Sequence, residues 1–198
     1  MTWHLAPEWQ TTDWLNTKEP LSLAKLRGRV VMLHAFQMLC PGCVARGIPQ
    51  AQRVQAAFAG APLSVVGMHT VFEHHDAMQL PSLKAFLHEY RVTFPVGVDA
   101  PGEGDHIPRT MRAYAMQGTP TTVLIDAQGY VRRQVFGVHD DLVLGAEIQT
   151  LLLEAEAHAR NAPPKPEHSV RRATPAFEEA APAGEGCDAS GCRIDDAP

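Results

Sequence analysis

The chain has 198 residues and a formal net charge of -5, with 45% hydrophobic and 20% charged residues. This length accommodates one domain with a sizeable core and an additional segment. The slightly acidic balance provides no basic field, which argues against nucleic acid or an anionic membrane as the partner.

Residues 1–20 are weakly patterned, and we expect them to form an arm that packs on a domain spanning residues 21–158. The apolar side chains that would pin this arm are Trp3, Leu5, Trp9 and Trp14. The arm lacks the basic start and apolar stretch of a secretory signal, and no segment has the length of a transmembrane helix. A cytoplasmic location is therefore expected. In that reducing compartment, four Cys favour redox cycling or metal binding over structural disulfides.

Further along the chain, the hydrophobic pattern indicates strands and helices in alternation. The expected strands are residues 30–37, 63–71, 94–98, 121–126 and 130–136. The expected helices are residues 41–59, 83–92, 110–116 and 140–157. Asp140 is placed to cap the last helix. Early strand–helix alternation predicts parallel strands, and the last two strands flank a hairpin turn at residues 127–129. The predicted fold class is α/β, a mixed central sheet flanked by helices.

The composition changes in residues 159–198, where Pro, Ala and Glu are abundant and large apolar residues are few. Such a segment cannot bury enough surface to fold alone, so a flexible C-terminal tail is expected. The tail carries a CxxxxC motif, Cys187 to Cys192.

The sequence Cys40-Pro41-Gly42-Cys43 lies between the first buried strand and the helix that follows it. At the start of a helix, N–H dipoles stabilise a thiolate, which is the reactive form of cysteine. The second Cys is close enough to close an intramolecular disulfide. We therefore expect thiol–disulfide exchange, in which Cys40 attacks a substrate disulfide and Cys43 resolves the mixed disulfide. A buried pair kept only for packing is the alternative.

The CPGC segment is followed at a distance by Gly118-Thr119-Pro120-Thr121 and by TTVLIDAQGYV. Together these motifs resemble the thioredoxin superfamily, and most closely its TlpA-like and redoxin (AhpC/TSA-related) branches. The resemblance covers roughly residues 6–157. It implies a thioredoxin-like fold and a thiol–disulfide oxidoreductase activity, and with it an antioxidant role.

In that family a cis-proline lies against the disulfide, and the backbone beside it receives an extended substrate strand. The resemblance assigns the cis-proline to Pro120 and substrate contacts to Thr119, Pro41 and Gly42. Proline tolerates the cis form, and it removes an N–H that would otherwise face the sulfurs.

Three positions depart from the family pattern. Leu39 replaces the Trp that usually precedes the first Cys, and the proline that kinks the helix falls one residue late, at Pro49. His34 occupies the place of a buried polar residue, which is Asp in thioredoxin. Because histidine titrates near neutral pH, His34 is a candidate to accept or donate the proton of Cys43. The alternative is a core histidine satisfied by a backbone carbonyl.

The tail cysteines have three interpretations. Cys187 and Cys192 form a second redox pair that relays electrons to the CPGC pair, because a linker of roughly thirty residues gives a millimolar effective concentration. Alternatively, they contribute to a soft-metal site that needs further ligands. In the third interpretation they are two loose thiols without a role.

His69, His74 and His75 follow the second expected strand, which should open on the same sheet edge as CPGC. The loop would then shape substrate access or bind a metal together with Asp76. An ordinary solvated loop is the favoured interpretation, since the spacing matches no tight zinc motif.

Two other functions compete with the oxidoreductase. A thiol peroxidase would use Cys40 or Cys43 as the peroxidatic residue, but the PxxxTxxC pattern of peroxiredoxins fails in both registers. A soft-metal-binding module would use the CxxC, the His-rich loop and the tail. For the oxidoreductase we expect no cofactor; its partners are a disulfide-containing protein or small molecule and an electron donor that the sequence does not identify.

Overall fold

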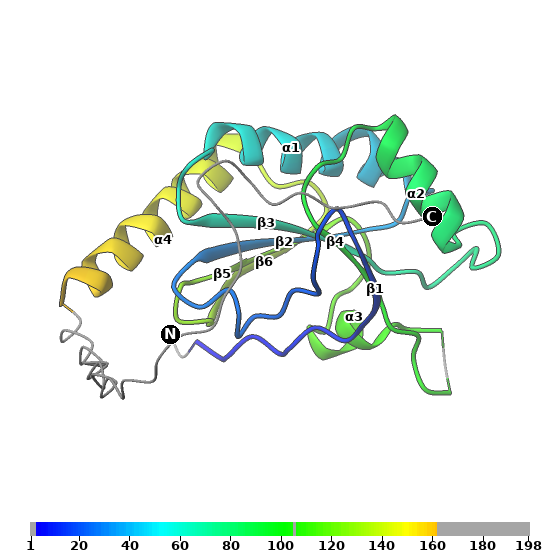
Figure 1. Ribbon diagram of the computed structural model, residues 1–198, viewed down its shortest axis with the longest axis horizontal. Coiled ribbons are helices and arrows are strands. Elements are labelled where there is room, and N and C mark those ends of the chain that lie inside the picture. Colours follow the sequence, from blue (N-terminus) through cyan, green and yellow to red (C-terminus); the bar gives the residue numbers. More distant parts are fainter. Residues whose placement is uncertain (1–2, 105, 162–198) are drawn as a thin grey trace, which may run out of the picture. The chain divides into compact units, whose positions relative to one another are not determined.

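The computed structural model describes residues 3–104 and 106–161. The strands are β1 (Thr11–Leu15), β2 (Val30–Phe36), β3 (Leu63–His69), β4 (Val96–Asp99), β5 (Thr121–Ile125) and β6 (Val131–Phe136). The helices are α1 (Ile48–Ala57), α2 (Leu80–Glu89), α3 (Arg109–Ala113) and α4 (Asp141–Asn161), and a π-helical turn, η1 (Cys43–Gly47), precedes α1. Apart from β1 and η1, these elements follow the predicted order (Figure 1).

The six strands form one mixed sheet in the order β1-β4-β3-β2-β5-β6. The parallel neighbours are β2 with β3 and β3 with β4, and the other pairs are antiparallel. All seven residues of β2 are buried, as a central strand covered on both faces requires. The mixed sheet and the β5–β6 hairpin are therefore as predicted.

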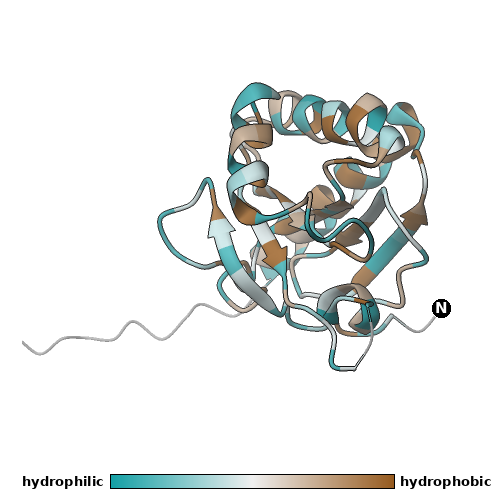
Figure 2. Cartoon of the chain, turned by 90° about the vertical axis from the view of Figure 1, so that its right-hand side faces the viewer, coloured by the Kyte–Doolittle hydropathy of each residue, from teal (hydrophilic) through white to brown (hydrophobic). Residues whose placement is uncertain are grey.

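Two apolar layers cover the two faces of the sheet. One face packs on α1, α2 and α4, through side chains such as Ile48, Leu83 and Ile148. The opposite face packs on α3 and the N-terminal residues, through Met111 and Trp9 among others. Figure 1 shows α1 above the sheet and α3 below it, and Figure 2 shows hydrophobic strands enclosed between the two layers.

The N-terminal arm is more ordered than its weak pattern indicates. Residues 11–15 form the edge strand β1, which pairs antiparallel with β4 from Thr11 to Leu15. Trp9 is buried and contacts Trp14, with ring centroids 5.9 Å apart. Trp3 and Leu5 remain exposed but contact the domain, since the guanidinium of Arg132 lies 4.7 Å from the Trp3 ring and Leu5 forms a β-bridge with Tyr130.

The segment after CPGC is not the single kinked α-helix that we expect from sequence. The N–H of Ile48 bonds to the carbonyl of Cys43, five residues earlier, and so widens this turn to a π-helix. Pro49 then lies in the first turn of α1, where its missing N–H costs no helical bond. The irregularity therefore lies before the proline, in the turn that begins at the second Cys of the motif.

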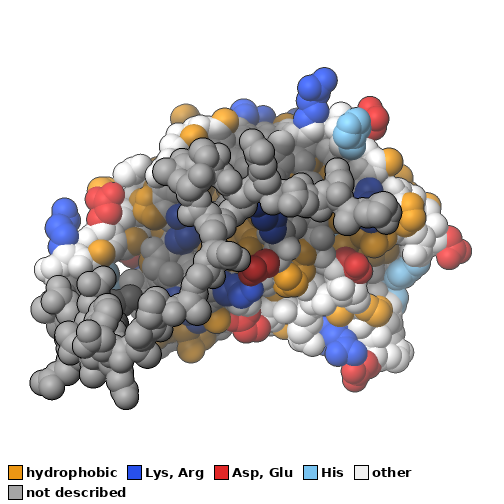
Figure 3. Space-filling view, in the orientation of Figure 1, with side chains coloured by type: hydrophobic (Ala, Val, Ile, Leu, Met, Phe, Trp, Pro, Cys, Tyr) orange, Lys and Arg blue, Asp and Glu red, His pale blue; other side chains and the backbone are white. Residues whose placement is uncertain are grey.

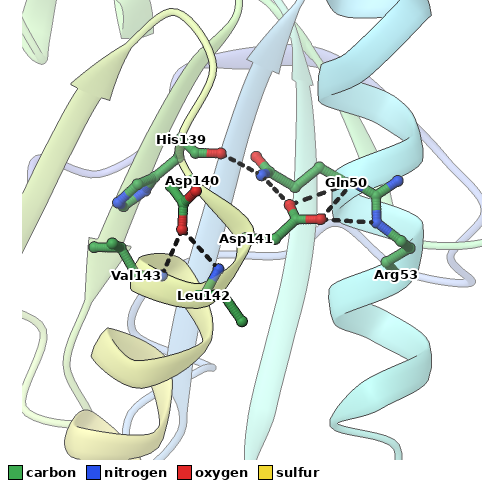
Figure 4. Close-up of polar contacts among 7 residues, drawn as sticks. All are labelled: Gln50, Arg53, His139, Asp140, Asp141, Leu142 and Val143. Atoms are coloured by element: carbon green, nitrogen blue, oxygen red, sulfur yellow. Dashed lines mark hydrogen bonds and ion pairs between the residues drawn. The ribbon is translucent and has the colours of Figure 1, made fainter.

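Helix α4 begins beside α1 through a set of polar contacts (Figure 4). The carboxylate of Asp140 accepts the N–H groups of Leu142 and Val143 at 2.9 and 3.1 Å, which confirms the predicted cap. Asp141 accepts bonds from Arg53 on α1. The helix continues to Asn161, beyond the predicted end at residue 157.

Nothing in the described part of the chain is both long enough and apolar enough to serve as a membrane-spanning helix. Among the coloured side chains in Figure 3, basic and acidic ones are interspersed. Residues 162–198 lie outside the described part, and the predictions for Cys187 and Cys192 fall there.

Candidate active site

Cys40 and Cys43 lie where β2 passes into η1, and both are free thiols. Cys40 is half-buried and Cys43 is fully buried. The backbone N–H of Cys43 points to the sulfur of Cys40 at 3.3 Å, as expected for a sulfur held at the start of a helix. The Cys40 thiol also donates to the carbonyl of Thr119 at 3.5 Å. The more accessible of the two sulfurs thus belongs to Cys40, the residue that we predict to attack the substrate disulfide.

The environment of Cys43 favours the protonated form of its thiol. Burial, reinforced by a hydrogen bond with Cys40, raises the pKa of the Cys43 thiol to about 12. At neutral pH this residue is therefore a protonated thiol that solvent does not reach. The two sulfurs have the unequal environments that sequential attack and resolution require.

Pro120 lies directly against the CPGC turn, as the family resemblance implies. The Thr119–Pro120 peptide bond is cis. A Cβ added to Gly42 would lie 3.4 Å from Cδ of Pro120, so the ring touches the turn. Pro120 is buried, Thr119 and Gly42 are half-buried, and Pro41 is exposed. Thr119 thus contacts the Cys40 thiol, and Pro120 contacts the turn that carries it.

His34 is enclosed between the sheet and η1. Its side chain is 1% exposed, and neither ring nitrogen has a hydrogen-bond partner within the described residues. The interpretation of His34 as a histidine satisfied by a backbone carbonyl is therefore wrong. Burial lowers its pKa from 6.5 to about 4, so the ring is neutral at physiological pH.

The position of His34 depends on Gly47, the last residue of η1. A Cβ on Gly47 would lie only 2.6 Å from Cε1 of His34 and 3.2 Å from Cβ of Pro120. The histidine ring thus occupies the space that a side chain at position 47 would fill. His34, Pro120 and the turn that carries Cys43 are packed against one another.

The His-rich loop does not form a metal centre in the described structure. His69 is buried at the end of β3, with its ring 5.3 Å from that of Phe36, and burial lowers its pKa to about 4. His74 and His75 are exposed. Over residues 3–104 and 106–161, no three His, Cys, Asp or Glu side chains gather as metal ligands.

Sequence reasoning missed Gln37, the residue that follows β2. Its side chain is 1% exposed and reaches the loop after β3, where it bonds to Phe72 and Glu73. A lone Gln at a strand end carries no motif. The only sequence signal was a polar residue that continues an apolar run.

Comparison with known proteins places this geometry in a family. The model of the AhpC/TSA family matches residues 4–134. A crystal structure of a thioredoxin-like superfamily protein is 59% identical, with a TM-score of 0.73, and the match covers 75% of this chain and 96% of that one. A thiol-disulfide isomerase from Corynebacterium glutamicum is 46% identical, with a TM-score of 0.70, over 74% of this chain and 96% of that one.

Among curated proteins, DipZ of Mycobacterium tuberculosis is 31% identical over 147 residues, or 73% of this chain. The chain spans about a fifth of the length of that relative, since the match covers 20% of it. The matched family, the mixed sheet and the placement of Cys40 and Cys43 beside a cis-proline agree. The chain belongs to the AhpC/TSA family and has the thioredoxin-like fold of the thiol–disulfide oxidoreductases.

Proposed function

We propose that the chain is a thiol–disulfide oxidoreductase that works through Cys40 and Cys43. The observation that carries the proposal is the pairing of a half-buried sulfur at a helix start with a buried thiol three residues later, beside Pro120. The names of the solved relatives, one of them a thiol-disulfide isomerase, support the same chemistry.

The exchange proceeds in two steps. The thiolate of Cys40 attacks a substrate disulfide, a Cys40–substrate disulfide forms, and the departing substrate sulfur takes up a proton. Cys43 then loses its proton and attacks the sulfur of Cys40, which closes the Cys40–Cys43 disulfide and releases the second substrate thiol. The substrate gains two electrons and two protons, and a separate dithiol donor must return them to the enzyme.

His34 is the proposed acceptor for the proton of Cys43. The ring is neutral at pH 7, and its unpaired nitrogens leave an acceptor free among the described residues. We expect His34→Leu to slow disulfide closure and to alter its pH–rate profile. Closure with an unchanged profile would remove His34 from the mechanism.

The substrates we propose are protein disulfides. The segments next to the site carry exposed apolar side chains, which we call the apolar rim: Leu39 precedes Cys40, and Phe136, Val138 and Leu142 lie within five residues of Gly137. The rim follows the backbone around Pro120, because the N–H of Gly137 donates to the carbonyl of Pro120 at 2.8 Å. Exposed apolar side chains beside a reactive sulfur favour an extended peptide over a charged small disulfide.

Leu142 offers a matched test of the rim. Leu142→Ser should lower kcat/KM several-fold for a protein disulfide such as insulin but not for a small aromatic disulfide. The control is Leu153→Ser on the same helix, since Leu153 is also exposed, at 55% against 85%, and lies three turns away. Equal effects of the two substitutions on insulin reduction would contradict the rim.

We further propose that Cys187 and Cys192 relay electrons to the CPGC pair. Helix α4 starts near the site and its 21 residues carry the chain about 31 Å away. Cys187 follows Asn161 by roughly 26 residues, whose extended length of about 85 Å is ample for a return. A linker as flexible as the composition predicts would have an end-to-end distance of about 30 Å, which is comparable to the length of α4.

The deciding experiment is a redox titration in graded thiol/disulfide buffers, with alkylation and mass-spectrometric mapping of all four Cys. Reversible closure of Cys40–Cys43 as one two-electron couple is the expected result. A core–tail disulfide trapped in the same samples would support the relay. If Cys40 and Cys43 stay reduced throughout, the oxidoreductase proposal fails and soft-metal binding becomes the leading function. A peroxide reaction no faster than that of a free thiol would exclude the peroxidase alternative.

A further inference from the structure

Gln37 is a buried amide between the CPGC turn and the loop that follows β3. The residue succeeds Phe36, the last of β2, and its side chain is 1% exposed. Polar side chains are rarely buried so completely unless both ends are bonded. The hydrogen-bond partners of the Gln37 amide therefore show which segment the side chain positions.

The side chain binds the loop of residues 70–79. Its amide N–H donates to the Glu73 carboxylate at 3.4 Å, and its oxygen accepts the N–H of Phe72 at 3.4 Å. A third bond closes the same junction, since the N–H of Thr70 donates to the carbonyl of Phe36 at 3.1 Å. In Figure 1 this loop joins β3 to α2 at the end of the sheet where β2 runs into η1.

The backbone of the same residue contacts both cysteines. The carbonyl of Gln37 accepts the N–H of Cys40 at 3.2 Å. The backbone of Gln37 also acts to lower the pKa of the Cys43 thiol, against the larger effect of burial, and so favours its thiolate form. The residue that the loop binds is thus the residue that accepts the N–H of Cys40 and supports the thiolate form of Cys43.

From these contacts we infer that Gln37 is a positioning residue for the resolving step, and that the loop of residues 70–79 acts on the dithiol through it. The inference rests on the proposed function. When the amide bonds are lost, the backbone at position 37 can move, and its support of the Cys43 thiolate weakens. Closure of the Cys40–Cys43 disulfide then slows, while attack by the accessible sulfur of Cys40 is little changed.

The test separates the two steps in a full-length chain that carries C187S and C192S. Reduced protein is mixed with 5,5′-dithiobis(2-nitrobenzoate) in a stopped-flow instrument. The attack of Cys40 releases one aromatic thiolate in a phase that depends on reagent concentration. The attack of Cys43 on the mixed disulfide releases the second in a concentration-independent phase. A chain that releases only one thiolate would refute the proposed function itself.

The informative variant is Gln37→Met, which keeps the size of the side chain and removes both amide bonds. We expect the second phase to slow by about three- to tenfold, from the typical worth of two long hydrogen bonds. Its pH profile should move to higher pH, because the thiolate of Cys43 loses support, and the first phase should change less than twofold. Equal slowing of both phases, or an unchanged second phase, would overturn the inference.

Glu73 provides the matched controls. Glu73→Gln keeps an acceptor for the amide of Gln37 and should leave both phases unchanged. Glu73→Leu removes that acceptor and should slow only the second phase, less than Gln37→Met does. If Glu73→Gln slowed closure as much as Glu73→Leu, the charge of Glu73 would be the active feature and the positioning role of Gln37 would be refuted.

Discussion

Gly47 lies where the reactive turn, His34 and Pro120 meet, and replacing it with Ala tests this packing. Without a steric clash, Gly47→Ala should stabilise the protein, since Ala is preferred over Gly within a helix by about 0.8–1.0 kcal/mol. A Cβ here would lie 2.6 Å from Cε1 and 2.7 Å from Nε2 of His34. The ring cannot move aside cheaply, because it is almost fully enclosed.

Overpacking of this kind costs roughly 1–3 kcal/mol. After the gain in helix propensity, we expect Gly47→Ala to lower the free energy of unfolding by up to about 2 kcal/mol. The same substitution at Gly145 is the control. A Cβ at Gly145, within α4, meets nothing within 4 Å, so Gly145→Ala should stabilise the protein by up to about 1 kcal/mol.

The decisive comparison is a double-mutant cycle with His34→Ala, measured by urea unfolding of the reduced protein at pH 7.5. Without the imidazole the nearest remaining contact of the new methyl is Cβ of Pro120, at 3.2 Å. Gly47→Ala should then become neutral or stabilising, with a coupling energy of about 2 kcal/mol. If Gly47→Ala lowered the free energy of unfolding equally in the wild-type and the His34→Ala proteins, the argument that His34 occupies this space would be refuted.

Two further predictions concern protonation. Burial lowers the pKa of His34 and His69 from 6.5 to about 4, so the unfolded chain binds these protons more readily than the folded one. Stability should therefore be retained above pH 6.5 and fall as the pH drops towards 4, by about 2 kcal/mol per histidine at pH 5. Urea unfolding at pH 7.5 and pH 5 measures this loss, and His69→Phe should reduce it; an unchanged loss in that variant would contradict the assignment. In the native reduced protein at pH 7.5, iodoacetamide should alkylate Cys40 and leave Cys43 unmodified until urea is added, because the pKa of Cys43 is raised to about 12 and its sulfur is buried. Equal labelling rates in mass spectrometry would show that this protection is absent.

The thiol–disulfide chemistry of the site could be predicted from short sequence motifs. The cysteines lie three residues apart at a strand–helix junction, and the start of a helix influences a sulfur in the same way in any fold. Thr119–Pro120 marks the cis-proline because only proline adopts that bond readily. The elements other than β1 and η1 were also predictable, since their hydrophobic period is a property of consecutive residues.

The tertiary structure alone decided the features that depend on distant partners. Strand β1 has no clear alternation, because as an edge strand it is held by pairing with β4, more than eighty residues away, as between Thr11 and Asp99. The π-helical turn at Cys43–Gly47 is equally invisible in a helical pattern.

The environments of the polar residues are also set by folding. His34 was recognised as a buried polar position, but its lack of a hydrogen-bond partner among the described residues follows from the way η1 closes over it. Gln37 gained its role only when β3 brought Phe72 and Glu73 beside it. Residue type and spacing determine which chemistry is available, whereas burial, pKa and coupling between loops come from contacts that residues far apart in the chain make on folding.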